Sequence, residues 1–309
     1  MITSVMYHYI RPIEDSQLRY LTIEDFEKQL DWLNESAGNF VTAVEWEKAK
    51  LGETCSGVLL TFDDGLKDHI NYVLPILEKR NIFAIFFVNT LPLVSNSMLA
   101  VHLTHKLLSI GKSIEILDSF HQLLPNSIWG KLNSGAASSA YSKHKDLEIN
   151  IKIKKIINYL FTDFDLTQLL DITSHRFLSS SLSQISASWY LTEEDVKTIS
   201  KAGMKIGSHA STHRLLSLLD REEVYLELLE SRSILESIVD AKVDEFCYPY
   251  GGSHSYNSSV KEILVQLKYS VAHDVNPRKI SKLDFQNRYS LPRFNCNELP
   301  FGTAHSLKI

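Results

Sequence analysis

Short apolar runs alternate with helical patterns along much of the chain. The first run, at residues 2–9, precedes a segment at 22–35 in which Phe26, Leu30 and Leu33 recur at the spacing of one helix face. By the same criterion, seven runs are expected to form strands: residues 2–9, 57–62, 83–88, 204–208, 245–248, 269–273 and 288–294. Because repeated strand–helix units are typical of parallel sheets covered by helices, we expect an α/β fold, either an open sheet or a distorted, incomplete (β/α) barrel of about seven parallel strands.

The alternation stops in the middle of the chain. Helical patterns at 98–109, 145–160 and 166–172 are joined there by serine-rich connections. We therefore expect a single domain over residues 1–309 that carries a helical insertion at about residues 95–185. Long excursions from the active face of a scaffold tend to carry specificity, so the insertion is expected to narrow the cleft and set substrate choice; an oligomer contact is the alternative.

Composition and charge narrow the functional class. Hydrophobic residues make up 44% and charged residues 22% of the chain, which is ordinary for a soluble globular protein. A net charge of -5 gives no general attraction to nucleic acid, so no nucleic-acid partner is expected. No apolar stretch approaches the roughly 20 residues of a transmembrane helix. Because the N-terminus also lacks the pattern of a secretory signal, we expect a cytoplasmic location, while the oligomeric state is left open.

Two adjacent carboxylates follow the second predicted strand. Asp63 and Asp64 stand where residues 57–62 end and a helix begins, the edge at which parallel folds of this type place their chemistry. Like charges at a semi-buried strand end repel each other, and a cation beside them relieves that repulsion. The alternative is that one carboxylate caps the following helix, with Gly65 supplying the turn.

Two histidines occupy the same kind of position after another predicted strand. His209 and His213 follow residues 204–208 and are four residues apart, so their imidazoles can converge on one metal from a helical turn or a tight loop. Neutral imidazole nitrogens are ligands that zinc, cobalt and nickel accept. A second close pair, His102 and His105, lies in a helical stripe of the insertion and is interpreted as structural.

The two strand-end motifs together predict a catalytic metal centre. One carboxylate and two histidines supply three ligands and leave positions open for water and substrate, whereas a closed structural zinc site wants a fourth ligand, most often cysteine. The three cysteines, Cys55, Cys247 and Cys296, are not near these motifs in sequence. The remaining carboxylate, that of Asp63, then stands beside a metal-bound water, whose pKa the metal lowers, and can act as its general base.

These motifs make the chain resemble the polysaccharide deacetylase family, also called carbohydrate esterase family four. The Thr-Phe-Asp-Asp-Gly motif of the family is present at residues 61–65, and its His-x-x-x-His motif at residues 209–213. The resemblance covers about residues 1–90 and 190–295. It implies a base and three ligands for one divalent metal, zinc with cobalt or nickel as alternatives: Asp63 as the base, and Asp64, His209 and His213 as the ligands.

The third motif of the family, of the Arg-x-Pro-Tyr type, is matched only in part. It corresponds to residues 247–251, with Cys247 where the arginine would stand. The resemblance implies that the backbone N–H of Tyr250 helps to bind the tetrahedral oxyanion. It also implies that Pro249 and Gly251 belong to a loop that lines the sugar site.

Two further roles in the family fall to residues outside its clear motifs. Arg293 is the candidate to replace the arginine that orients Asp63, with a surface or interface arginine as the alternative. The family motif Leu-x-His, which supplies a proton donor to the leaving amine, has no clean equivalent near the C-terminus. His273 is the candidate donor, and a buried histidine bonded to backbone is the alternative. His8, in the first predicted strand, is a candidate for the pocket wall.

The resemblance therefore predicts metal-dependent hydrolysis of an N-acetyl, or other N-acyl, group of an amino-sugar-containing saccharide. A cytoplasmic location would favour a lipid-linked, nucleotide-linked or short saccharide, as in surface-polysaccharide assembly. An O-deacetylase, a deformylase and a cyclic-amide hydrolase are alternatives on the same fold. The rival from another class is a metal-containing saccharide-binding protein with weakened catalysis, suggested by the absent arginine, although such a protein would not need to keep Asp63.

Overall fold

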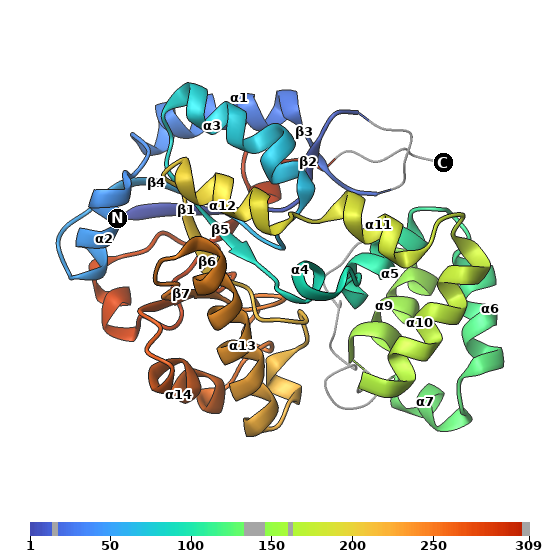
Figure 1. Ribbon diagram of the computed structural model, residues 1–309. Coiled ribbons are helices and arrows are strands. Elements are labelled where there is room, and N and C mark those ends of the chain that lie inside the picture. Colours follow the sequence, from blue (N-terminus) through green and yellow to red (C-terminus); the bar gives the residue numbers. More distant parts are fainter. Residues whose placement is uncertain (14–17, 133–145, 160–162, 305–309) are drawn as a thin grey trace. The chain divides into compact units, whose positions relative to one another are not determined.

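The computed structural model describes residues 1–13, 18–132, 146–159 and 163–304, except for the side chains of 163–168 and 170. The chain divides into two compact units (Figure 1). One contains Met1–Glu14, Arg19–Ser95 and Trp189–His305, and the other consists chiefly of Asn96–Ser188. The organisation expected from the sequence, a single domain over the whole chain with an insertion, stays a prediction.

The first unit is built around one parallel sheet, whose strands lie in the order β8-β7-β6-β5-β4-β1-β9. Every neighbouring pair in this order is parallel. The strands are β1 (Ile2–Tyr7), β4 (Gly57–Phe62), β5 (Ala84–Val88), β6 (Lys205–Ser208), β7 (Glu245–Cys247), β8 (Val271–His273) and β9 (Phe294–Asn295). The seven parallel strands predicted from the sequence are confirmed. A small separate sheet pairs β2 (Ile10–Arg11) with β3 (Leu21–Thr22).

The sheet curls into a distorted, incomplete barrel, as the sequence predicts. Its edge strands β8 and β9 are joined by an irregular segment instead of a regular ladder. Within it, the N–H of Leu291 donates to the carbonyl of Ala272 (2.8 Å), and the Leu291 carbonyl accepts from the N–H of Asp274 (2.9 Å). The strand expected at residues 288–294 is therefore shorter and lies later in the chain. This closure carries Arg293 across the gap between β8 and β1.

Side chains on both faces of the sheet are buried, which is typical of parallel sheets. Alternate residues of β4 show this: Val58 and Leu60 belong to one core cluster, whereas Leu59 packs in another with Trp46. The described α-helices of this unit are α1 (Ile23–Ala37), α2 (Ala43–Lys50), α3 (Leu74–Arg80), α4 (Leu91–Ser95), α12 (Glu193–Lys201), α13 (Arg221–Val239) and α14 (Ser258–Gln266). Thr192 caps α12, since its side chain accepts from the N–H of Asp195.

The second unit is helical and has its own core. Its helices are α5 (Ala100–Leu108), α6 (Ser113–Leu123), α7 (Asn126–Lys131), α9 (Glu148–Tyr159), α10 (Asp163–Phe177) and α11 (Leu182–Trp189). Buried apolar side chains from several of them form one cluster, among them Leu107, Phe120 and Ile156. Among the described residues, no helix of either unit combines the length and the apolar character needed to cross a membrane.

Candidate active site

The first motif forms a sharp turn at the carboxyl end of β4. Asp64 adopts a left-handed backbone conformation with φ 79°, and Gly65 follows with φ 62°. A side chain at Gly65 would place its Cβ 2.9 Å from Cγ1 of Val88, so this tight turn leaves no room for one. Both carboxylates, Asp63 and Asp64, are thereby held at the strand end, and both are almost fully buried.

The second motif forms a loop at the carboxyl end of β6. Two of its residues, Ala210 and His213, have left-handed backbone conformations, with φ 60° and 61°. The segment that follows the neighbouring β5 holds this loop in place: the side-chain amide of Asn89 donates to the carbonyl of His209, and the N–H of Leu91 donates to the carbonyl of Ser211 (3.0 Å). The loop therefore lies beside the turn that carries the two carboxylates.

Three potential ligand atoms converge between these two motifs. Oδ1 of Asp64 lies 3.3 Å from Nε2 of His209 and 3.4 Å from Nε2 of His213. Two zinc ligands that are each about 2.1 Å from a tetrahedral ion lie about 3.4 Å apart. The distances of both imidazole nitrogens from Oδ1 of Asp64 therefore fit one shared ion, and the three ligand atoms all lie within 4.8 Å of one another.

The hydrogen bond on the other side of His209 favours the same arrangement. Its Nδ1 lies 2.8 Å from the backbone carbonyl oxygen of Cys247, which can only accept a hydrogen bond. In the neutral ring, Nδ1 must therefore carry the proton, which leaves Nε2 with the lone pair that a metal ion would need. Burial disfavours the charged ring, but the interactions with Cys247 and the hydrogen bond to Asp64 outweigh it and raise the pKa of His209. The charged ring carries a second proton on Nε2, which a metal ion would have to displace.

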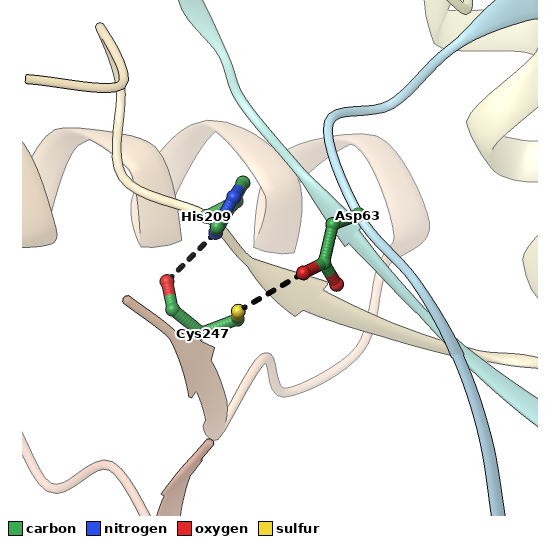
Figure 2. A group of neighbouring side chains, drawn as sticks. All are labelled: Asp63, His209 and Cys247. Atoms are coloured by element: carbon green, nitrogen blue, oxygen red, sulfur yellow. Dashed lines mark hydrogen bonds between the residues drawn. The ribbon is translucent and has the colours of Figure 1, made fainter. Parts of the chain in front are cut away.

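A second group of possible ligands shares His209 and consists of Asp63, His209 and Cys247 (Figure 2). Figure 2 shows the thiol of Cys247 directed at Asp63, where Sγ donates to Oδ2 over 3.4 Å. Burial raises the pKa of this thiol, and the thiolate is the form that binds metal. The carboxylate of Asp63 is, in addition, already held by other donors. We therefore favour the group that contains Asp64.

Arg293 is the main partner of Asp63. Its Nη1 and Nη2 donate to Oδ1 and Oδ2 of Asp63, each over 2.8 Å, and both side chains are buried. Nη1 also donates to Oγ1 of Thr61 (2.9 Å), and Nε to the carbonyl of Asp274 (3.2 Å). Burial alone would raise the pKa of Asp63, but the charge of Arg293 outweighs it and lowers the pKa to about 2. The carboxylate is therefore ionised and fixed in orientation.

The guanidinium reaches Asp63 from the segment that closes the barrel, and it passes beside Cys247. Nη2 of Arg293 lies 2.8 Å from the Sγ of Cys247, so the thiol accepts from the arginine and donates to the carboxylate. Cys247 thus stands where the resemblance to the family leads us to expect an arginine. Arg293, from a distant part of the chain, contacts the carboxylate of Asp63 instead.

Comparison with known proteins agrees with this geometry. The family model for polysaccharide deacetylase matches residues 50–111 and 164–272, which is more than half of the chain. The chain belongs to the polysaccharide deacetylase family. The resemblance seen in the motifs is thereby confirmed, as is the expected enzyme class, a hydrolase that acts on acetyl amide bonds. A comparison with curated proteins gave no match.

Several solved deacetylase structures share the fold. The Streptococcus pyogenes deacetylase PplD in complex with acetate is 17% identical, with a TM-score of 0.59, and the match covers 95% of this chain and 91% of that chain. The de-N-acetylase from Aggregatibacter actinomycetemcomitans is 13% identical, with a TM-score of 0.55 and coverage of 95% and 94%. The BpsB deacetylase domain from Bordetella bronchiseptica is 12% identical, with a TM-score of 0.54 and coverage of 95% and 95%. At these identities the likeness shows the fold.

The partly matched third motif, at residues 247–251, lies beside the candidate ligands. The ring of Tyr250 is 4.9 Å from that of His213, centroid to centroid. Pro249 is buried at the end of β7. Gly251 has φ 64°, and a Cβ there would meet Cγ2 of Val275 at 2.3 Å, so this turn also requires glycine. The roles of these residues in binding an oxyanion or a sugar stay predictions.

His8 and His273, the two further histidines proposed for the site, differ in their surroundings. His8 lies with Nε2 3.8 Å from Oδ2 of Asp64, and 34% of its side chain is exposed. His273 is not brought into this group: its side chain is fully buried, and its Nε2 lies 3.3 Å from Oε2 of Glu245. Burial lowers the pKa of His273. Its packing against Trp46 and Phe87 is typical of a core histidine. The alternative named from the sequence was a buried histidine bonded to the backbone, whereas the observed partner is the carboxylate of Glu245.

Sequence analysis missed three residues that support the site of this deacetylase. His69 donates from Nε2 to the carbonyl of His8 (3.1 Å), and burial lowers its pKa to about 4. Asn89 contacts the histidine loop, and its position directly after a predicted strand was an available signal. Glu227 lies at a buried position of α13, where a charged residue in a mostly apolar stripe was the signal.

Proposed function

We propose that this protein removes the N-acetyl group of an amino-sugar-containing saccharide in a metal-dependent hydrolysis. The observation that carries the proposal is the convergence of Asp64, His209 and His213 beside Asp63, whose carboxylate is held by Arg293. Family membership supports the reaction type. The specific saccharide, the metal and the roles of single residues are the proposed parts.

Zinc is the proposed metal, with cobalt or nickel as alternatives. Asp64 would supply one carboxylate oxygen, and His209 and His213 would each supply Nε2. Three protein ligands of this kind, with open positions remaining, are typical of catalytic zinc sites. Bound there, such an ion would lower the pKa of a water molecule and polarise the amide carbonyl.

Asp63 is the proposed general base. A carboxylate whose pKa is about 2 is ionised at neutral pH, so it can accept a proton from the attacking water. It is also a weak base, because Arg293 lowers its pKa while it fixes the orientation of the carboxylate. The backbone N–H of Tyr250 is the proposed donor to the developing oxyanion, as the resemblance of the third motif implies, and the Tyr250 ring lies next to His213.

His8 is the better candidate for protonating the leaving amine. It lies next to Asp64 and is partly exposed, so its imidazole can exchange protons with solvent and reach a bound substrate. The sequence-based candidate, His273, is fully buried and bonded to Glu245. We therefore propose His8 as the donor in place of His273.

An end-point assay tests the proposed reaction. The zinc-loaded protein should release acetate and free amine in equal amounts from an N-acetylated amino-sugar oligosaccharide, and an O-acetylated sugar should be a poorer substrate. Release of acetate from the O-acetylated sugar alone would favour the O-deacetylase, and formate release from an N-formyl sugar the deformylase. Tight saccharide binding without any product would favour the binding protein, which the contact between Arg293 and Asp63 argues against.

The cellular setting is a further proposal. A role in surface-polysaccharide assembly and a cytoplasmic location fit a lipid-linked, nucleotide-linked or short saccharide substrate. Fractionation of cells that produce the full protein checks the location, since activity and antigen should appear in the cytoplasmic fraction.

A further inference from the structure

The loop that carries both candidate histidine ligands is bonded to one buried carboxylate on a helix outside the motifs. We infer that Glu227 of α13 is a positioning residue, which holds the loop from His209 to His213 in its metal-binding arrangement. The inference rests on the proposed metal site and deepens it. It assigns no direct contact with metal or substrate to Glu227.

The carboxylate of Glu227 accepts hydrogen bonds from the middle of this loop. Its Oε2 accepts from the backbone N–H groups of Ser211 and Thr212, each over 3.0 Å. Its Oε1 accepts from the hydroxyl of Thr212 and from Nε and Nη2 of Arg214, over 3.2 and 3.1 Å for the arginine. The bonds thus lie between the two histidines and directly after the second one.

The backbone of the loop explains why such an anchor is needed. Ala210 and His213 lie on either side of the bonded residues, and both have left-handed backbone conformations. Such conformations are unfavourable for residues other than glycine. The left-handed turn at His213 accompanies the return of its imidazole to Asp64, where Nε2 lies 3.4 Å from Oδ1. An unfavourable conformation of this kind persists only where the surroundings fix it, and Glu227 bonds to the two residues between these positions.

The burial of Glu227 argues against an incidental contact. Only 4% of the residue is exposed, and it lies on the same buried stripe of α13 as Val224, Leu228 and Ser231. A buried carboxylate is unfavourable unless several donors satisfy it. Here the backbone amides of the ligand loop supply two of those donors, so the carboxylate and the loop conformation depend on each other.

Glu223, one turn earlier on α13, provides a matched control. Its carboxylate accepts from Nη1 of Arg214 (3.0 Å) and from the N–H of Asp220 (3.1 Å). No hydrogen bond of Glu223 to Ser211 or Thr212 is found among the described residues. Glu223→Gln therefore weakens the pairing of Arg214 without touching the loop amides.

The test is a Co²⁺ titration of the full-length protein, followed by the visible absorption of the bound ion. Glu227→Gln should weaken Co²⁺ binding by about 10–100-fold, the usual effect of removing a partner that orients a metal ligand. The absorption spectrum of bound Co²⁺ should also change, and turnover should recover as the Co²⁺ concentration is raised. Glu223→Gln should leave both the affinity and the spectrum close to those of the unsubstituted protein.

An unchanged Co²⁺ affinity and spectrum in Glu227→Gln, with or without a lower melting temperature, would overturn the inference, because the role would then be structural only. If this variant does not fold, Thr212→Val removes one of the same bonds and should still weaken Co²⁺ binding several-fold; unchanged binding there would overturn it equally. If the unsubstituted protein binds no Co²⁺, the proposed metal site itself fails, and the inference falls with it.

Discussion

The guanidinium of Arg293 donates two hydrogen bonds of 2.8 Å to the carboxylate of Asp63, across 230 residues of sequence. Both groups are buried, so each supplies the counter-charge that the other requires. The contact makes Asp63 an ionised, oriented carboxylate beside the candidate metal ligands. It also makes Asp63 a weak base, which has consequences for the dependence of activity on pH.

The first prediction concerns that pH dependence. Asp63 has its pKa lowered to about 2, so its ionised form is lost only as the pH falls through that value, and activity near neutral pH should not reflect its protonation. In Arg293→Met, burial remains while the cation is removed, so the pKa of Asp63 should rise. The acidic limb of kcat/KM, measured from about pH 4 to 9, should move to higher pH.

Arg293→Lys serves as the control for this prediction, because it keeps the positive charge and loses the bidentate hydrogen bonds to Asp63. Its acidic limb should lie between those of the unsubstituted protein and Arg293→Met. An identical acidic limb in all three proteins would mean that Arg293 does not set the ionisation of the base.

The second prediction separates the two adjacent carboxylates. Asp63→Asn should keep metal content close to normal and lower turnover by about 10²–10⁴-fold, since proton transfer is lost. Asp64→Asn should lose bound metal, because it removes a charged ligand. Metal content is measured by elemental analysis after dialysis. Equal metal loss in the two variants would contradict the division of roles.

The third prediction distinguishes the two candidate proton donors. His8→Gln should lower turnover by about 10²-fold with little effect on thermal unfolding, as expected for a partly exposed general acid. His273→Asn should instead lower the free energy of unfolding by about 1–3 kcal/mol, because the buried carboxylate of Glu245 loses a partner. Normal turnover in His8→Gln, with a specific loss in His273→Asn, would restore the sequence-based assignment.

The fourth prediction concerns the helical unit at residues 96–188. This unit has its own apolar core, separate from the cores of the sheet unit. Replacing the helical unit by a short Gly/Ser bridge should therefore leave the sheet unit able to fold. We expect the shortened protein to keep metal binding and hydrolysis of a small N-acetylated test compound while losing discrimination among saccharides. Unchanged selectivity together with an altered assembly state, measured by light scattering, would favour an oligomer contact.

Local patterns in the sequence were sufficient to predict the sheet and to place the candidate metal ligands at strand ends. Apolar runs of strand length recur because a parallel sheet is buried on both faces, and Asp64, His209 and His213 each stand just after or near such a run. The last strand was predicted less well. The barrel closes there through single backbone bridges at Leu291, which leave no periodic pattern in the sequence.

Contacts between distant segments account for what the sequence left open. The sequence named Arg293 as a candidate partner of Asp63, with a surface or interface arginine as the alternative, and the closing segment carries it to Asp63. The pairing of His273 with Glu245 depends on the register of β7 and β8. Glu227 was passed over for the same reason, because its ligand-loop partners come from another element. A charged residue in a buried helix stripe is the one local sign that pointed to such a contact.

A crystal structure of the zinc-loaded protein, with anomalous diffraction measured at the zinc edge, tests the proposed metal centre most directly. We expect one peak bounded by Oδ1 of Asp64 and the Nε2 atoms of His209 and His213, at about 2.0–2.2 Å from each, with Asp63 still paired to Arg293. A peak bonded to Sγ of Cys247 and the carboxylate of Asp63, or no peak near the two histidines, would contradict it.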